Sequence, residues 1–116
     1  MGRSHRKMPS RLAEKLFLIR WHLGLTQEQM VERLKSKMSQ ALEEIPPLYP
    51  GHVSEFERGR REPLLVVLLY YARLAEVPLE NLVDDSLSLP GFYFNYEFDE
   101  EVVRYKKNLN RSRSIK

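Results

Sequence analysis

The stretch that decides the fold is Leu25-Thr26-Gln27-Glu28-Gln29-Met30. Thr26 is a residue type that caps helices, and Gln29 stands three positions on, where its side chain can reach back to the cap. Leu25 and Met30 occupy the two positions of a hydrophobic staple, which fixes the direction of the chain as it enters the helix. Together these features predict a helix that starts at Thr26.

A second stretch, Val53-Ser54-Glu55-Phe56-Glu57-Arg58-Gly59, has the pattern of a short amphipathic helix and its end. Gly59 can adopt the left-handed backbone conformation that closes a helix. Three arginines crowd this corner, namely Arg58, Arg60 and Arg61. Cations grouped beside a helix end indicate that phosphates bind nearby. The two stretches therefore predict a helix-turn-helix that binds DNA.

Apolar residues recur at helical spacing elsewhere in the chain, bounded by caps, glycines and prolines. On these grounds we expect further helices over residues 10–23, 50–58, 63–75 and 78–83. Ser10 is expected to cap the first of them and Gly24 to end it. The helix that starts at Thr26 either runs on to Ile45, ahead of two prolines, or breaks near residues 36–39.

The pattern changes beyond Asp85. Aromatic residues fall on every second position from Phe92 to Phe98, and a period of two predicts a short strand. Residues 99–109 are expected to form a helix, because acidic residues gather at its start and Lys106 and Lys107 stand near its end, as the helix dipole favours.

Length and composition exclude several classes of protein. A chain of 116 residues, 42% of them apolar, supports one small core but no second, ligand-sensing domain. Without cysteine, and with three histidines that share no helical spacing, no metal site is expected. The longest apolar run, 63–72, is too short to cross a bilayer at roughly 20 residues, which indicates a cytoplasmic protein without membrane contact. Paired glutamates at 43–44 and 100–101 have no matched base or nucleophile, so neither an enzyme nor a cofactor is expected.

The basic residues are concentrated at the two ends of the chain. Residues 1–11 contain four Lys or Arg and no acid, and residues 104–116 contain six and no acid. The middle of the chain carries all sixteen acids against nine bases, a net charge of −7. Basic arms commonly bind polyanions. They also serve as solubilising tails, and the sequence leaves both alternatives open.

One group of residues carries a family resemblance: Leu16, Arg20, Gly24-Leu25-Thr26-Gln27, Ser54 to Gly59, Pro63, Leu68, Ala72 and Leu82. Through them the segment from Arg11 to Val83 resembles the Cro and lambda-repressor type (xenobiotic-response-element class) helix-turn-helix family of DNA-binding transcriptional regulators. The resemblance implies an all-α, five-helix repressor-type domain. We therefore expect a basic N-terminal arm over residues 1–10, the helix-turn-helix domain over 11–85, and a C-terminal extension with an aromatic segment and a basic tail over 86–116.

The resemblance also implies a set of DNA contacts, since the third helix of this family lies in the major groove. Phosphate contacts are implied for Gln27 at the start of the second helix and for Arg58, Arg60 and Arg61 after the third. Base-reading positions fall near Tyr49, His52, Ser54 and Glu55. Family members with Arg and Glu at the positions of Arg20 and Glu57 join the first and third helices by a buried ion pair, so the same pair is expected here.

Three features depart from the family's pattern. About a dozen extra residues, over roughly 35–49, separate Thr26 from Gly59 and form an insertion within the motif itself. Pro50 and Gly51 stand where the family usually places base-reading side chains. The carboxylate of Glu55 would repel phosphate.

The sequence favours a regulator that binds double-stranded DNA as a homodimer, without catalysis. The alternative is an antitoxin or adaptor that binds a protein partner through its aromatic C-terminal segment. The helix over 63–75 bears on both. Its core face is expected to hold Leu65, Leu68, Leu69 and Ala72, whereas Val66, Val67, Tyr70 and Leu74 fall on a face that a lone domain would leave to solvent. We expect an interface in which Phe92, Phe94, Tyr96 and Phe98, from the same chain or a twofold partner, cover that face.

Overall fold

The computed structural model describes residues 8–94 and 100–114, and this part of the chain is all helical, as expected. The elements are α1 (Leu12–Leu23), α2 (Gln27–Ser39), α3 (Pro50–Glu57), α4 (Leu65–Ala75), α5 (Glu80–Val83), the 3-10 helix η1 (Gly91–Phe94) and α6 (Glu100–Ser114). The first five helices fall close to their predicted places, although α4 begins at Leu65 rather than at Pro63 and α5 at Glu80 rather than at Pro78.

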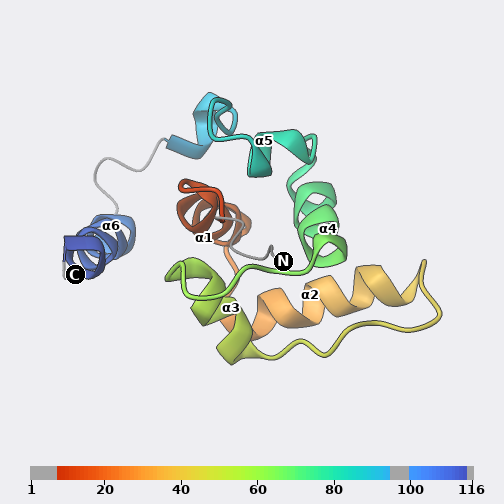
Figure 1. Cartoon of the computed structure of the whole chain (residues 1–116). Coiled ribbons are helices and arrows are strands. Elements are labelled where there is room, and N and C mark those ends of the chain that lie inside the picture. The colour runs from red at the N-terminus through yellow and green to blue at the C-terminus, as the bar shows by residue number, and fades with distance from the viewer. Residues whose placement is uncertain (1–7, 95–99, 115–116) are drawn as a thin grey trace, which may run out of the picture.

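Helix α1 lies at the centre of the molecule (Figure 1). It packs against α3, α4, α5, η1 and α6, so side chains on several of its faces are buried. Leu16 and Ile19 are fully buried, and so are Phe17 and Leu18, which point in other directions around the helix axis. A helix that is apolar nearly all round requires cover on all sides. These five elements therefore surround α1, whereas α2 packs against α3 and α4.

Helix α2 begins as its local sequence predicts. The backbone N–H of Gln29 donates to the Thr26 hydroxyl at 3.0 Å, and the Gln29 side chain accepts from the Thr26 backbone N–H at 2.9 Å. The helix ends at Ser39, so the shorter of the two alternatives is correct. Residues 40–49 then return beside α2 toward α3 as an irregular segment (Figure 1), with Leu48 buried in the core.

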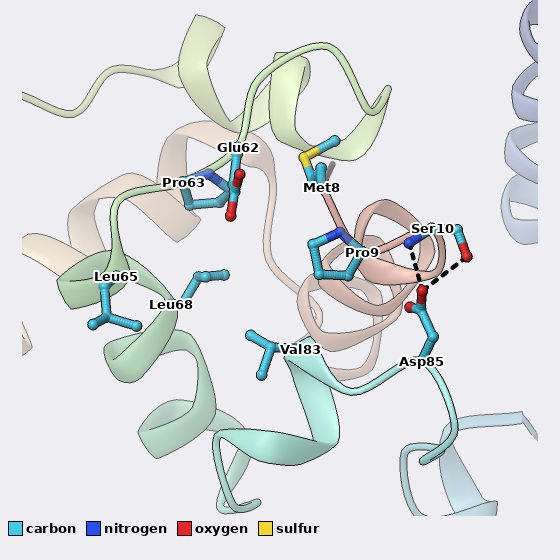
Figure 2. A pocket seen from close by; sticks show the side chains of 9 residues that line it. All are labelled: Met8, Pro9, Ser10, Glu62, Pro63, Leu65, Leu68, Val83 and Asp85. Atoms are coloured by element: carbon cyan, nitrogen blue, oxygen red, sulfur yellow. Dashed lines mark hydrogen bonds between the residues drawn. The ribbon is translucent and has the colours of Figure 1, made fainter. Parts of the chain in front are cut away.

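The start of α1 is capped from a distance. The prediction that Ser10 caps this helix is wrong, because the residue before α1 is Arg11 and no side-chain cap bond forms there. Asp85 supplies acceptors for the backbone at this point instead (Figure 2). Its carboxylate accepts from the backbone N–H groups of Ser10 at 2.8 Å and Arg11 at 3.1 Å. The Arg11 guanidinium in turn donates to the Asp85 carbonyl at 2.9 Å. This cap ties the first turn of α1 to the segment that follows α5.

The buried face of helix α4 differs from the one that the sequence predicts. Val67 and Tyr70 are only 2% and 4% exposed, and Val66 and Leu74 are half-buried against the same core, whereas Leu65 is 69% exposed. The physical reason is that α4 packs between α1 and α2, so a wider stripe of the helix is buried than a lone core face requires. The prediction that this face of α4 is left to solvent and forms an interface is therefore wrong.

The described parts of the C-terminal extension, η1 and α6, pack against α1. Residues 91–94 form a 3-10 turn, so the predicted strand is wrong there; Tyr96 and Phe98 lie outside the described residues. Tyr93 is buried, and its hydroxyl donates to the Ala75 carbonyl at 3.2 Å. The helix predicted over 99–109 is present as α6 and continues to Ser114.

Tyr71 on α4 yields a first prediction. Within the described residues, its hydroxyl is the one buried side-chain polar atom without a hydrogen-bond partner, and burial raises its pKa. Leaving a buried hydroxyl unsatisfied costs about 1–3 kcal/mol. Tyr71→Phe should therefore fold normally and melt at the same or a higher temperature in thermal denaturation. A clear loss of stability would show that the hydroxyl is engaged.

Asp85 yields a second prediction, on pH dependence. Its pKa is lowered, first by hydrogen bonds from the backbone of Ser10 and Arg11. A carboxyl whose pKa falls on folding stabilises the folded state above its unfolded pKa, and the contribution disappears as the pH falls through the folded value. Asp85→Ala should therefore lower the melting temperature at neutral pH, with a deficit that shrinks in acid. The exposed Glu32→Ala is the control, and a deficit independent of pH would contradict the role of the charge.

Candidate nucleic-acid interface

A buried ion pair joins α1 to α3, as predicted. The Arg20 Nε lies 2.6 Å from Glu57 Oε2, and Arg20 Nη2 donates to Glu57 Oε1 at 3.0 Å. The two side chains are only 10% and 4% exposed. Burial disfavours the Arg20 cation, but the hydrogen bond and charge of Glu57 outweigh it, and the pKa of Arg20 is raised. This two-pronged geometry fixes both the distance and the angle between the helices.

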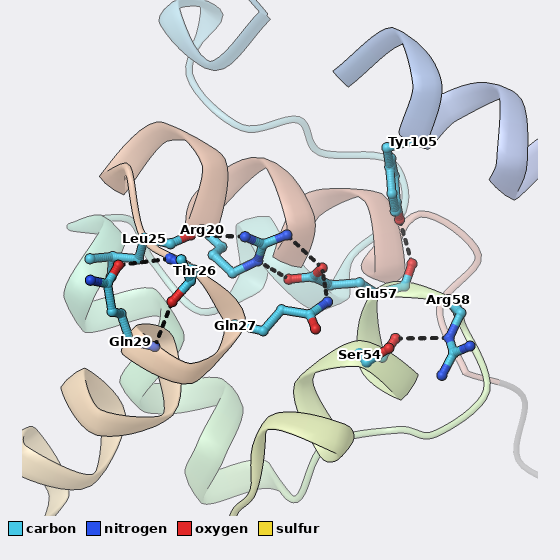
Figure 3. A network of polar contacts seen from close by, with 9 residues as sticks. All are labelled: Arg20, Leu25, Thr26, Gln27, Gln29, Ser54, Glu57, Arg58 and Tyr105. Carbon is cyan, nitrogen blue, oxygen red and sulfur yellow. Dashed lines mark hydrogen bonds and ion pairs between the residues drawn. The ribbon is translucent and has the colours of Figure 1, made fainter. Parts of the chain in front are cut away.

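The same pair reaches the start of α2 (Figure 3). Arg20 Nη1 donates to the Leu25 carbonyl at 2.8 Å, and Gln27 Nε2 donates to Glu57 Oε1 at 3.2 Å. Gln27, predicted to bind phosphate, thus uses one amide N–H inside the protein. An amide carries two such donors, so one remains for a ligand. The network places the start of α2 and the end of α3 in a fixed relation.

The end of α3 closes in the manner that Gly59 predicted. Gly59 has φ 73°, and its N–H donates to the Phe56 carbonyl at 3.1 Å, while the Arg60 N–H donates to the Glu55 carbonyl at 2.9 Å. These two bonds form a Schellman closure, which satisfies the last carbonyls of the helix. The chain therefore leaves α3 by a tight turn that carries Arg60 and Arg61 in exposed positions.

Charges on α3 and its turn are partly compensated. Arg61 Nε lies 2.6 Å from Glu55 Oε1, and the pKa of Glu55 is lowered, first by this hydrogen bond from Arg61. Arg58 Nε donates to the Ser54 carbonyl at 3.4 Å. Arg58 and Arg60 are exposed. The Arg61 cation thus lies directly beside the Glu55 carboxylate and offsets its negative charge locally.

The start of α3 is ordered by local contacts. The backbone N–H of Tyr49 donates to His52 Nδ1 at 3.1 Å, so this imidazole nitrogen is the acceptor. Tyr49 is 59% exposed, and the Lys35 ammonium lies 5.6 Å from the centre of its ring. None of the eight residues predicted to contact DNA is fully buried, and seven of them lie on or beside α3.

Sequence reasoning missed Tyr105 on α6. Its ring stacks on Phe17 with centroids 3.9 Å apart, and its hydroxyl donates to the Glu57 carbonyl (Figure 3). Lys106 pairs with Glu14 on α1 at 2.9 Å. The signal available in the sequence was the helical spacing of Val102 and Tyr105, which marks an inward face of α6. That face brings α6 to the end of α3.

Other kinds of site have little support. No group of three or more His, Asp or Glu residues that could hold a metal occurs in the described ranges. None of the helices described there is long and apolar enough to cross a membrane. An open groove of about 820 Å³ lies between the ends of α1, α4 and α5 (Figure 2), but the carboxylate of Asp85 at its edge is already committed to the helix cap.

Comparisons of the chain with protein-family models, with curated proteins and with solved structures find no match. No family assignment follows from them.

The Arg20–Glu57 pair yields a third prediction. Glu57→Ala leaves the Arg20 cation buried without its partner, and breaking such a pair typically costs about 3–5 kcal/mol. We expect a large drop in the free energy of unfolding, measured in urea. Glu32→Ala, an exposed glutamate of α2, should change stability by no more than about 0.5 kcal/mol. Equal stability of Glu57→Ala and the wild type would contradict the structural role of the pair.

Proposed function

We propose that the protein is a DNA-binding transcriptional regulator, in which α2 and α3 form the helix-turn-helix. One observation carries the proposal: a short helix with half-buried polar residues ends in a tight turn that presents Arg58, Arg60 and Arg61 together. Helices of this kind bind DNA by placing their polar face in the major groove while flanking cations contact phosphates. The buried Arg20–Glu57 pair supports the proposal, because it holds α3 in a fixed orientation before DNA arrives.

In this proposal the predicted contacts divide into two classes. Gln27, Arg58, Arg60 and Arg61 bind phosphates, which sets affinity and register but carries no sequence information. Tyr49, His52, Ser54 and Glu55 lie near the bases. Glu55 can accept a hydrogen bond from the amino group of cytosine. Its pairing with Arg61 places an acceptor for a base next to a donor for a phosphate.

A homodimer acting in the cytoplasm completes the proposal. Helix α3 has eight residues, so a single copy touches only a few base pairs. Two copies related by a twofold axis would read half-sites about 34 Å apart and gain specificity from both. The proposal includes no catalysis and no cofactor.

The alternative, an antitoxin or adaptor that binds a protein through the aromatic segment, has weaker support. Tyr93 is buried against the protein's own core, and α6 is tied to α1 by Tyr105 and Lys106. The parts of the extension that flank residues 95–99 are thus already engaged within the chain. This arrangement favours the regulator.

The test uses duplex DNA selected from a random pool, together with DNA flanking the protein's own coding region. Arg60→Ala should weaken binding to all duplexes by a similar factor and flatten the log-log salt dependence by about 0.9, the value for one phosphate contact. His52→Ala should instead change which sequences are preferred. Binding is measured by gel shift or fluorescence anisotropy at several salt concentrations.

Lys37→Ala, an exposed cation toward the far end of α2, is the matched control for lost charge and should leave the salt slope unchanged. Absence of any duplex binding by the wild type would refute the proposal. Binding without any sequence preference would leave a nonspecific DNA-binding protein rather than a regulator.

A further inference from the structure

Helix α6 carries a basic outer face. Arg104 and Lys107 are exposed and stand three positions apart, so they share one side of the helix. Beyond them the helix continues to Ser114, over a stretch that contains Arg111 and Arg113. The acidic residues of α6, Glu100 and Glu101, lie in its first turn, where Glu100 stands four positions before Arg104 on the same side of the helix. Beyond this first turn, all charged residues in the sequence of the helix are basic.

The opposite face of α6 is anchored to the protein. Val102 is fully buried, Tyr105 stacks on Phe17, and Lys106 pairs with Glu14. These contacts hold α6 on α1 (Figure 1) and leave Arg104 and Lys107 facing outward. An amphipathic helix binds a membrane surface through a free apolar face. Among the described side chains of α6, Val102 and Tyr105 face the protein and Val103 is exposed without an apolar neighbour on its side, so residues 100–108 present no such face.

The anchor also places α6 beside the end of α3. The Tyr105 hydroxyl donates to the carbonyl of Glu57, the last residue of α3 (Figure 3). The next residue along the chain is Arg58, and Arg60 and Arg61 follow in the turn. The hydrogen bond thus places the inward face of α6 at the end of α3, while the exposed Arg104 and Lys107 lie on the other side of the same helix.

We propose that α6 is a second DNA-contacting element, which binds backbone phosphates of duplex DNA beside the segment read by α3. Arg104 and Lys107 are the residues that make these contacts. The inference rests on the proposed function and extends it, because phosphate contacts made outside the groove helix add affinity without adding sequence information. The hydrogen bond to Glu57 keeps the two elements in register on the duplex.

The test compares the full-length double variant Arg104→Ala/Lys107→Ala with the wild type. Two lost phosphate contacts should flatten the log-log salt slope by about 1.8, so that between 50 and 200 mM salt the wild type loses about tenfold more affinity than the variant. Sequence preference should stay the same. The charge-matched control is Arg33→Ala/Lys37→Ala on α2, where both cations are exposed and four positions apart; its salt slope should match the wild type.

A second arm varies the length of the duplex. On a duplex trimmed to the bases that α3 protects, the wild type and the α6 variant should bind equally, because the flanking phosphates are missing. Extending the duplex should restore the difference. A difference that does not depend on duplex length would overturn the proposal, since the charges would then act through the net charge of the protein.

The outcomes separate this proposal from the one on which it rests. If Arg60→Ala weakens binding but the α6 variant behaves like the α2 control, only the role of α6 is wrong. If the wild type binds no duplex at all, both proposals fall. If the α6 variant loses binding to single-stranded RNA or to anionic phospholipid vesicles but not to duplex DNA, α6 serves another polyanion and the proposal is overturned.

Discussion

The buried pair of Arg20 and Glu57 is the constraint on which the arrangement of the site depends. Two ions removed from water are tolerated only when each finds close, well-directed partners, and here both prongs of the guanidinium meet the carboxylate. The same two residues bind the Leu25 carbonyl and the Gln27 amide at the start of α2. The backbone carbonyl of Glu57 accepts from Tyr105 on α6. One pair thus sets the positions of four helices.

This constraint explains how so short a helix can present a defined surface. Eight residues of α3 would not hold a helix alone in water, because isolated helices of that length are marginal. The core side chains Val53 and Phe56 fix one face, Glu57 fixes the rotation, and the turn at Gly59 fixes where the chain leaves. What remains is a half-buried polar face beside a group of exposed arginines, which is the chemistry that a polyanion requires.

The errors of sequence reasoning share one cause. The face of α4 was misjudged because Val67 and Tyr70 are buried by packing that a helical wheel does not include. The alternation of Phe92, Phe94 and Tyr96 is typical of a strand, yet the turn at Pro90 and the buried ring of Tyr93 support a 3-10 helix over residues 91–94 instead. Propensity gives a local preference, and tertiary packing overrides it when it buries more apolar surface.

The sequence by itself determined those features whose partners lie within a few residues. Thr26 and Gln29 cap one helix, and Gly24 and Gly59 end two others, because each of these bonds closes inside a single turn. Only the tertiary structure decided that Asp85 caps α1 from 75 positions away and that Tyr105 joins α6 to α3. Such contacts depend on how the chain folds back on itself. No local pattern encodes that distance, since it is set by the packing of the whole core around α1.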